Sequence, residues 1–307
     1  MRRSEEEEEA ERPDPRQRRH VSRREPTLKS SAEWLEAVER VGRWVRVRDD
    51  RGVEAVLPTR GAHVVVADRV RVAEGLVVET APRRTVLERT GETAGVRIVA
   101  SNADQMLIVA AASDPPFRPG LVDRMLVAAA YGGMTPLLVL NKCDAGMPEE
   151  VLEWLARYEA LGCPVALVSA QTGQGVDELA ALLVGKTSVL LGHSGVGKST
   201  LVARLIPGAV ALTGELDAWG RGRHTTTSAR MYNLAGGGRV IDVPGIREFG
   251  VGQVPRTELR RYFPELLDLP CKFRDCLHLG DEGCVAEAAV TWPERLESYR
   301  KLVEECL

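Results

Sequence analysis

The sequence predicts a multi-domain protein with a small all-β domain, a central α/β domain built on a parallel sheet, and a short C-terminal α-helical module. Two changes of pattern support this division. Residues 34–85 hold short strands with alternating apolar residues, whereas residues 86–252 alternate continuous apolar strands with amphipathic helices. Residues 253–307 lose that alternation, and half of the six cysteines cluster between positions 271 and 284.

A charged tail, residues 1–33, precedes the first domain. Its first thirty residues hold nine Lys/Arg and eight Asp/Glu with almost no apolar side chain, so we predict that it is disordered. It lacks the apolar core of a secretory signal, and no apolar run in the chain is long enough to span a bilayer. We therefore expect a cytoplasmic protein without membrane contact. The net charge is −3, so any nucleic-acid contact must use a local basic patch.

The first domain is predicted from three short segments. VGRWVRVR, residues 41–48, alternates with a period of two and runs into the turn signal DDRG. ADRVRV at 67–72 and GLVVET at 75–80 follow as a further hairpin. A five-stranded barrel of the OB type is the natural candidate, and any small sheet with solvated arginines is the alternative.

The central domain is predicted from strands that alternate with helices. The apolar strands fall within residues 97–112, 135–140, 164–170 and 187–191. The amphipathic helices fall within residues 120–133, 147–162, 175–185 and 198–206. This order predicts βαβ units and a parallel sheet covered on both faces, followed by a hairpin over residues 229–245.

A phosphate-binding loop is predicted at GHSGVGKS, residues 192–199, which matches G-x-x-x-x-G-K-[ST] between a strand and a helix. Its backbone N–H groups can surround phosphates, Lys198 can place its charge on the β- and γ-phosphates, and Ser199 can bind Mg²⁺. A glycine-rich turn without a ligand is the alternative. The predicted contacts are Gly192, His193, Ser194, Gly195, Val196, Gly197, Lys198, Ser199 and Thr200.

Guanine selectivity is predicted from NKCD, residues 141–144. Asp144 can accept hydrogen bonds from N1–H and the exocyclic amine of guanine, a donor pair that adenine lacks. The stem of Lys142 can lie along the base, and Asn141 can tie the base loop to the phosphate loop. The backbone of VSA, after the next strand, can face guanine O6. The predicted base-site residues are Asn141, Lys142, Cys143, Asp144, Ser169 and Ala170.

Two further segments complete the predicted site. In DVPG, Asp242 suits a water-mediated contact with Mg²⁺ and the Gly245 N–H can sense the γ-phosphate. Between this motif and the phosphate loop lies GRGRHTTTS, residues 220–228. We expect Thr226, with Thr225 as second choice, to bind Mg²⁺ when GTP is bound, the alternative being a plain surface loop.

The order of these motifs is circularly permuted. An ordinary GTPase runs from the phosphate loop through the threonine and DxxG to NKxD, whereas here NKxD comes first. Permutation is tolerated because each motif follows a parallel strand and domain termini lie at the surface. DxxG now leads directly into the C-terminal module, so nucleotide state can be passed to that module.

Catalysis needs a group that orients water. Many GTPases place a glutamine directly after DxxG, but here that residue is Ile246. His224 is the nearby candidate, and a histidine that only packs the loop is the alternative.

A metal site is predicted from C-x4-C-x-H-x5-C, which comprises Cys271, Cys276, His278 and Cys284. Three thiolates and one imidazole suit a structural, tetrahedral Zn²⁺ site. The alternative is a reduced cysteine cluster without metal. Cys143, Cys163 and Cys306 are most simply free thiols.

The chain resembles the ribosome small-subunit-dependent GTPase A family in NKCD, GHSGVGKSTL, GRHTTTSAR, IDVPGIREFG and CKFRDCLHLGDEGCVAEAAV. The resemblance implies an OB-type domain, a GTPase stimulated by the small (30S) subunit, a late role in that subunit's assembly, and a catalytic part for His224. It departs from the family in ADRV, where an alanine stands before D-x-V in place of the usual glycine, and in DEGC, which lacks the usual proline before the last Gly-Cys.

We therefore expect a monomeric, Mg²⁺-dependent hydrolase that converts GTP to GDP and phosphate and binds the small subunit and its rRNA. One rival is an RNA-binding protein whose nucleotide site is regulatory or vestigial, and another is an ATP-using P-loop enzyme, which Asp144 opposes. The arginines expected to contact the ribosome are Arg43, Arg46, Arg48, Arg69 and Arg71.

Overall fold

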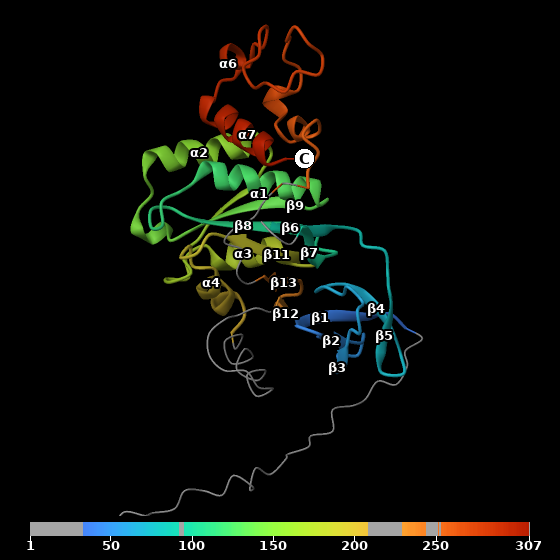
Figure 1. The fold of residues 1–307 in the computed structure, drawn as a ribbon. Coiled ribbons are helices and arrows are strands. Elements are labelled where there is room, and N and C mark those ends of the chain that lie inside the picture. The colour runs from blue at the N-terminus through green and yellow to red at the C-terminus, as the bar shows by residue number, and fades with distance from the viewer. Residues whose placement is uncertain (1–32, 92–94, 208–228, 244–250, 252, 307) are drawn as a thin grey trace, which may run out of the picture.

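The computed structural model describes residues 33–91, 95–207, 229–243, 251 and 253–306 (Figure 1). The predicted charged tail lies almost entirely outside these residues. A sheet of eleven strands runs through both the first and the central domain in the order β10-β9-β8-β11-β13-β12-β1-β2-β3, with β4 beside β1 and β5 beside β4. One sheet therefore joins two regions that the sequence pattern separates.

Five neighbouring strands of this sheet are parallel, as predicted. They are β10 (Val165–Leu167), β9 (Thr135–Asn141), β8 (Gln105–Ala111), β11 (Thr187–Gly192) and β13 (Arg239–Asp242). Every residue of β8 and of β11 is buried. Their continuous apolar sequence reflects cover on both faces.

Helices cover the two faces of the parallel strands (Figure 1). α1 (Pro119–Tyr131) and α2 (Glu149–Ala160) pack on one face, and α3 (Val176–Leu183) and α4 (Lys198–Leu205) on the other. None of the helices within the described ranges combines the length and the apolar character needed to cross a membrane.

The predicted hairpin is present and makes the sheet mixed. β12 (Arg230–Asn233) runs antiparallel to β13, and its other edge meets β1 (Leu35–Val41) through the pair Glu39 and Arg230. The hairpin thus links the parallel strands to the N-terminal strands.

The N-terminal β-domain contains five antiparallel strands, but its elements differ from the prediction. After β1 come β2 (Trp44–Arg48), β3 (Glu54–Pro58), β4 (Arg69–Ala73) and β5 (Leu76–Thr80). The strand expected within residues 41–48 is present as β2, but it begins only at Trp44, because Val41 ends β1 and the chain reverses at Gly42, whose φ is +58°. The alternation of apolar and polar residues continues across Gly42, so the sequence pattern does not reveal the turn. β1 and β3 were not predicted.

A buried carboxylate ties this domain to the next hairpin, β6 (Val86–Gly91) and β7 (Gly95–Ser101). Asp68 Oδ1 accepts hydrogen bonds from Arg83 Nε at 2.8 Å and Ser101 Oγ at 2.7 Å. Its Oδ2 accepts from Arg83 Nη2 and from the Val65 N–H, both at 2.8 Å. The preceding residue, Ala67, occupies the left-handed region with φ of +69°, a conformation that glycine adopts most readily.

The C-terminal module shares its core with the α1 face of the central domain (Figure 1). It contains the 3-10 turns η4 (Leu259–Tyr262) and η5 (Pro264–Leu266), α6 (Ala286–Ala289) and α7 (Pro293–Glu305). On α7, the guanidinium of Arg295 is buried between Asp123 of α1, at 2.5 Å, and Glu265 of η5. It also stacks on the ring of Phe263, 4.7 Å away. The module is therefore fastened to α1 by charge as well as by apolar contact.

Arg295→Ala tests this attachment. Removing the guanidinium leaves Asp123 and Glu265 without their buried cation, so we expect the free energy of unfolding to fall by about 3–5 kcal/mol. The measurement is urea denaturation. Lys301→Ala is the matched control, because Lys301 lies on the same helix in an exposed pair with Glu297 and should cost less than about 1 kcal/mol. Equal losses in the two variants would contradict the attachment.

Candidate functional site

The predicted nucleotide motifs meet at one edge of the sheet. Asn141 ends β9, Gly192 ends β11 and Asp242 ends β13, and these strands run parallel with β8 among them. Ser169 and Ala170 follow the neighbouring β10. The carboxyl ends of parallel strands are where open α/β sheets bind ligands.

The phosphate loop depends on glycine for close approach. A Cβ on Gly192 would lie 2.3 Å from the Val109 carbonyl oxygen, and a Cβ on Gly197 would lie 2.3 Å from Asn141 Nδ2. Gly195 and Gly197 also adopt left-handed conformations, with φ of +85° and +91°. The loop ends where α4 begins, so its backbone and a helix N-terminus face the same space.

Asn141 joins the two loops, as the sequence predicts. Its side chain is 1 % exposed, and Nδ2 donates to the Val196 carbonyl at 2.8 Å. Its Oδ1 accepts from the Ala170 N–H at 2.9 Å. Sequence reasoning missed a second link: Arg204 of α4 donates to the carbonyls of Ala170 and Gln171, at 3.2 and 2.6 Å. The only sequence signal for this contact is that Arg204 lies on the helix that follows the phosphate loop.

The remaining base-site residues lie beside Asn141. Lys142 is left-handed, with φ of +64°, and its Nζ donates to the Asp114 carbonyl at 2.6 Å. Asp144 is exposed on the same turn. Burial raises the pKa of the Cys143 thiol, with a further rise from Asp144. Ser169 is buried and its Oγ accepts from the Thr172 N–H.

Lys198 at the start of α4 and Asp242 at the end of β13 carry opposite charges. Lys198 Nζ donates to the carbonyls of Gly192 and His193, at 2.6 and 2.7 Å. Burial lowers the pKa of Lys198 and raises that of Asp242, and each group opposes the shift of the other. Ser199 is exposed at the start of α4, so a hydroxyl and a carboxylate offer the oxygen ligands that suit Mg²⁺.

Several predicted residues lie outside the described residues. They are His224, Thr225, Thr226, Gly245 and Ile246.

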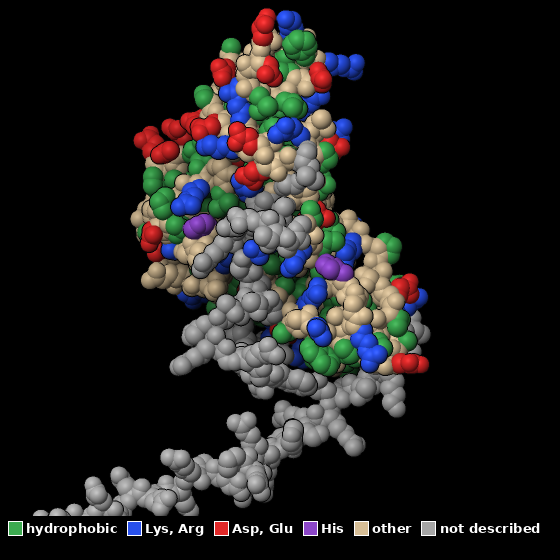
Figure 2. Space-filling view, in the orientation of Figure 1, with side chains coloured by type: hydrophobic (Ala, Val, Ile, Leu, Met, Phe, Trp, Pro, Cys, Tyr) green, Lys and Arg blue, Asp and Glu red, His purple; other side chains and the backbone are tan. Residues whose placement is uncertain are grey.

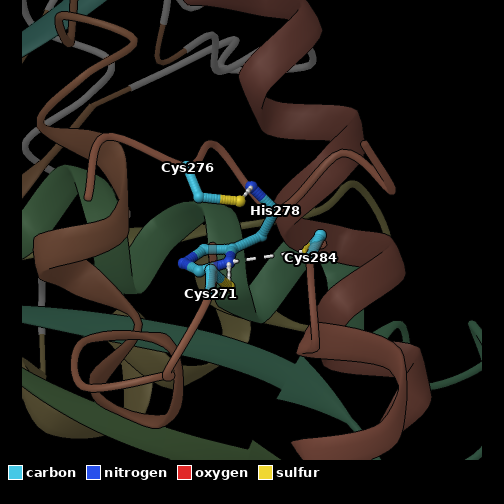
Figure 3. A group of neighbouring side chains, drawn as sticks. All are labelled: Cys271, Cys276, His278 and Cys284. Atoms are coloured by element: carbon cyan, nitrogen blue, oxygen red, sulfur yellow. Dashed lines mark hydrogen bonds between the residues drawn. The ribbon is translucent and has the colours of Figure 1, made fainter. Parts of the chain in front are cut away.

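The four predicted metal ligands come together in the C-terminal module (Figure 3). The ligand atoms of Cys271, Cys276, His278 and Cys284 all lie within 4.8 Å of one another. His278 Nδ1 is 3.5 Å from Cys271 Sγ and 3.9 Å from Cys284 Sγ. Its backbone is left-handed, with φ of +59°, a conformation that residues other than glycine adopt rarely.

The chemistry of this cluster suits a soft or borderline cation. Burial lowers the pKa of His278, which favours the neutral imidazole that a ligand must be. Burial raises the pKa of the Cys276 thiol to about 11, so its thiolate needs a nearby positive charge. Three sulfur atoms and one nitrogen are a ligand set of structural zinc sites.

A concave surface on the β-domain is lined by basic side chains and an aromatic ring. Arg40, Arg43, Arg60 and His63 line it together with Trp44, which is 46 % exposed. Figure 2 shows Lys and Arg side chains over the visible face of this domain, at the lower right.

The predicted ribosome-facing arginines are distributed differently. Arg43 lines the concave surface. Arg46 pairs with Glu39 and Glu54, Arg48 with Glu36, and Arg71 with Glu79. Arg69 donates to the Trp34 carbonyl. The charges of Arg46, Arg48 and Arg71 are therefore balanced by neighbouring carboxylates.

Comparisons with known proteins identify a family for this chain. The RsgA GTPase family model matches residues 80–252. The small ribosomal subunit biogenesis GTPase RsgA of Chlorobaculum parvum is 42% identical over 254 residues, which are 78% of this chain and 81% of that protein. The RsgA of Chromohalobacter salexigens is 44% identical over 257 residues, 80% of this chain and 74% of the relative.

Solved structures show the same fold. The crystal structure of YjeQ from Thermotoga maritima has a TM-score of 0.67 at 28% identity, covering 89% of this chain and 98% of that one. The crystal structure of YloQ, described as a circularly permuted GTPase, has a TM-score of 0.65 at 24% identity, covering 92% and 97%. The second likeness concerns the fold alone.

The Cys/His cluster predicts one bound metal ion per chain. Cys276→Ser removes a ligand, so we expect elemental analysis to find well under one equivalent, and protease to cut more readily after residue 255 because binding energy orders such modules. Cys306→Ser is the matched control, since Cys306 is a buried thiol of the same module outside the cluster. A wild-type protein that carries no metal yet has an ordered module would refute the prediction.

Proposed function

The chain belongs to the RsgA GTPase family, and on that premise we propose that it hydrolyses GTP to GDP and phosphate on the small ribosomal subunit, late in the subunit's maturation. Family membership rests on the model match over residues 80–252 and on relatives at 42% and 44% identity. The observation that carries the proposal is the buried amide of Asn141, which holds the phosphate loop and the base loop together.

The residues have separable parts in this reaction. Backbone N–H groups of residues 192–200 and the Lys198 ammonium hold the phosphates, while Asp144 reads guanine beside Lys142. Ser199 and Thr226 would hold Mg²⁺ directly and Asp242 through water. When bound, Mg²⁺ neutralises charge that develops on the phosphates. His224 would orient the attacking water, because Ile246 has no group that can do so.

Two rival functions are less well supported. An ATP-using enzyme would leave the Asp144 carboxylate facing a base edge without its donor pair. A vestigial nucleotide site would not need Lys198 at the start of α4 and the carboxylate of Asp242 at the end of β13. Both observations favour hydrolysis of GTP.

We propose that the C-terminal cluster holds one structural Zn²⁺. Four protein ligands leave no open position, which is typical of structural rather than catalytic zinc. The module around it is fastened to α1 by Arg295, so its position follows that of the central domain.

We propose that residues 34–85 form an OB-type barrel whose concave face contacts rRNA. Pairing of β1 with both β2 and β4, and of β4 with β5, supports a barrel. Arg40, Arg43 and Arg60 can contact phosphates, and exposed Trp44 can stack on a base. Because Arg46, Arg48 and Arg71 are paired within the domain, we expect these three to contribute less than Arg43 does. Action on a ribosomal subunit implies a cytoplasmic site of activity.

Asp144→Asn tests the base selectivity. The amide presents a donor where xanthine has a carbonyl, so we expect GDP to bind more weakly and xanthosine diphosphate more tightly. A site built on such hydrogen bonds discriminates by roughly 10⁴–10⁵. Titration with fluorescent nucleotides measures both affinities. Asp177→Asn on α3 is the control and should leave them unchanged. Wild-type protein that binds ATP as tightly as GTP would refute the assignment.

Turnover with purified small subunits tests the proposed reaction. We expect the wild type to hydrolyse GTP slowly alone and faster with subunits, and to leave ATP intact. A positioned catalytic group is worth about 10²–10⁴ in rate, so His224→Ala should lose most of the stimulated turnover. It should keep GDP affinity and subunit binding, whereas Lys198→Ala should lose phosphate binding. A fully stimulated His224→Ala protein would remove this histidine from the mechanism.

A further inference from the structure

Three charged residues lie opposite one another on three adjacent strands. Glu39 of β1 pairs in register with Arg230 of β12, and Arg230 pairs in register with Asp242 of β13. Residues directly opposite in antiparallel strands point to the same face of the sheet. A continuous row therefore runs from the β-domain to the carboxylate at the nucleotide site.

Charge fixes the first two members of this row. Glu39 is 3 % exposed, and a carboxylate so buried must be paired. Its Oε1 lies 3.9 Å from Arg230 Nη1, and its Oε2 lies 3.3 Å from Arg46 Nε. The Arg230 guanidinium also lies over the ring of Tyr232, 5.4 Å from its centroid. Arg230 is thus held from β1 and from its own strand.

Backbone contact reinforces the row at the same point. The Arg40 N–H donates to the Ala229 carbonyl at 3.3 Å, immediately before β12. Arg40 also lines the concave basic surface of the β-domain. Arg40, the residue next to Glu39, therefore contacts the hairpin and also lines the surface that we propose for RNA.

The third member, Asp242, is the residue whose position matters for chemistry. It ends β13, and its electrostatic partner is Lys198 of the phosphate loop. Because β12 is hydrogen-bonded to β13, a shift of β12 relative to β1 would also move the end of β13, which carries the Asp242 carboxylate.

We propose that Arg230, held by Glu39, is a positioning residue for Asp242, so that the β-domain sets the metal side of the nucleotide site. The inference rests on the proposed function, because it takes Asp242 as a group that acts on Mg²⁺ through water. Glu39 and Arg230 should therefore affect how nucleotide binding depends on Mg²⁺, and not the affinity for nucleotide without Mg²⁺.

The test is the Mg²⁺ dependence of nucleotide binding. The Mg²⁺ concentration that gives half the full gain in affinity for a fluorescent, non-hydrolysable GTP analogue is measured in the intact protein. We expect Glu39→Gln and Arg230→Gln to raise it by about 3- to 30-fold, the range typical of positioning through a neighbour. GDP affinity in EDTA should stay within about twofold, which a general loss of structure would not allow.

Glu36→Gln is the matched control. Glu36 lies on the same strand and also bridges to the hairpin, but through Arg239, which pairs with Asn233 at the end remote from the nucleotide site. We expect no shift in its Mg²⁺ dependence. The double variant of Glu39 and Arg230 should raise the half-maximal Mg²⁺ concentration no more than Arg230→Gln alone does. Both substitutions remove the same interaction between β1 and β12, so their effects should not add.

The outcomes separate the possible failures. Equal shifts in the Glu36 and Glu39 variants, or no shift in Arg230→Gln, would overturn the positioning role while leaving the proposed function intact. Wild-type protein without Mg²⁺-dependent guanine nucleotide binding would overturn the proposed function and this inference with it. If Glu39→Gln does not fold, Arg230→Gln carries the test alone.

Discussion

One buried amide sets the geometry on which the nucleotide site depends. Asn141 donates to the Val196 carbonyl of the phosphate loop and accepts from the Ala170 N–H after β10, so it fixes the distance between these two loops. Gly197 must be glycine because a Cβ there would collide with that amide. Lys142 and Asp144 follow Asn141 in the chain, and Lys198 follows Gly197. The charged groups of both loops therefore take their positions from this contact.

Permutation of the motifs leaves this contact intact because strand ends, rather than chain order, build the site. The permutation does change which parts of the chain adjoin the site. β13 carries Asp242 and stands between the phosphate-loop strand and β12, which meets the β-domain. The C-terminal module that follows packs on α1 and is held there by the buried Arg295. Both flanking units thus contact the central domain through charged pairs, Glu39 with Arg230 and Arg295 with Asp123.

Some arginines of the β-domain form ion pairs with neighbouring glutamates, and others line its concave surface. Arg46 and Arg48 face carboxylates on the neighbouring strands, whereas Arg43 and Arg60 line a concave surface beside Trp44. A balanced arginine offers a phosphate less net charge than one without a carboxylate neighbour. Strand register therefore decides which of these arginines are balanced by carboxylates, and the same register connects Glu39 to Arg230.

The sequence by itself determined the parallel strands and their helices, the motifs at the strand ends, and the four candidate metal ligands within fourteen residues. These depend on local periodicity and spacing, which any window of the chain displays. Tertiary structure alone decided the turn at Gly42, the partners of Arg46 and Arg48, the hold of Arg204 on the base loop, and the row from Glu39 to Asp242. Glu39 and Arg230 are separated by most of the chain, and no local pattern specifies which distant strand a charged residue will face.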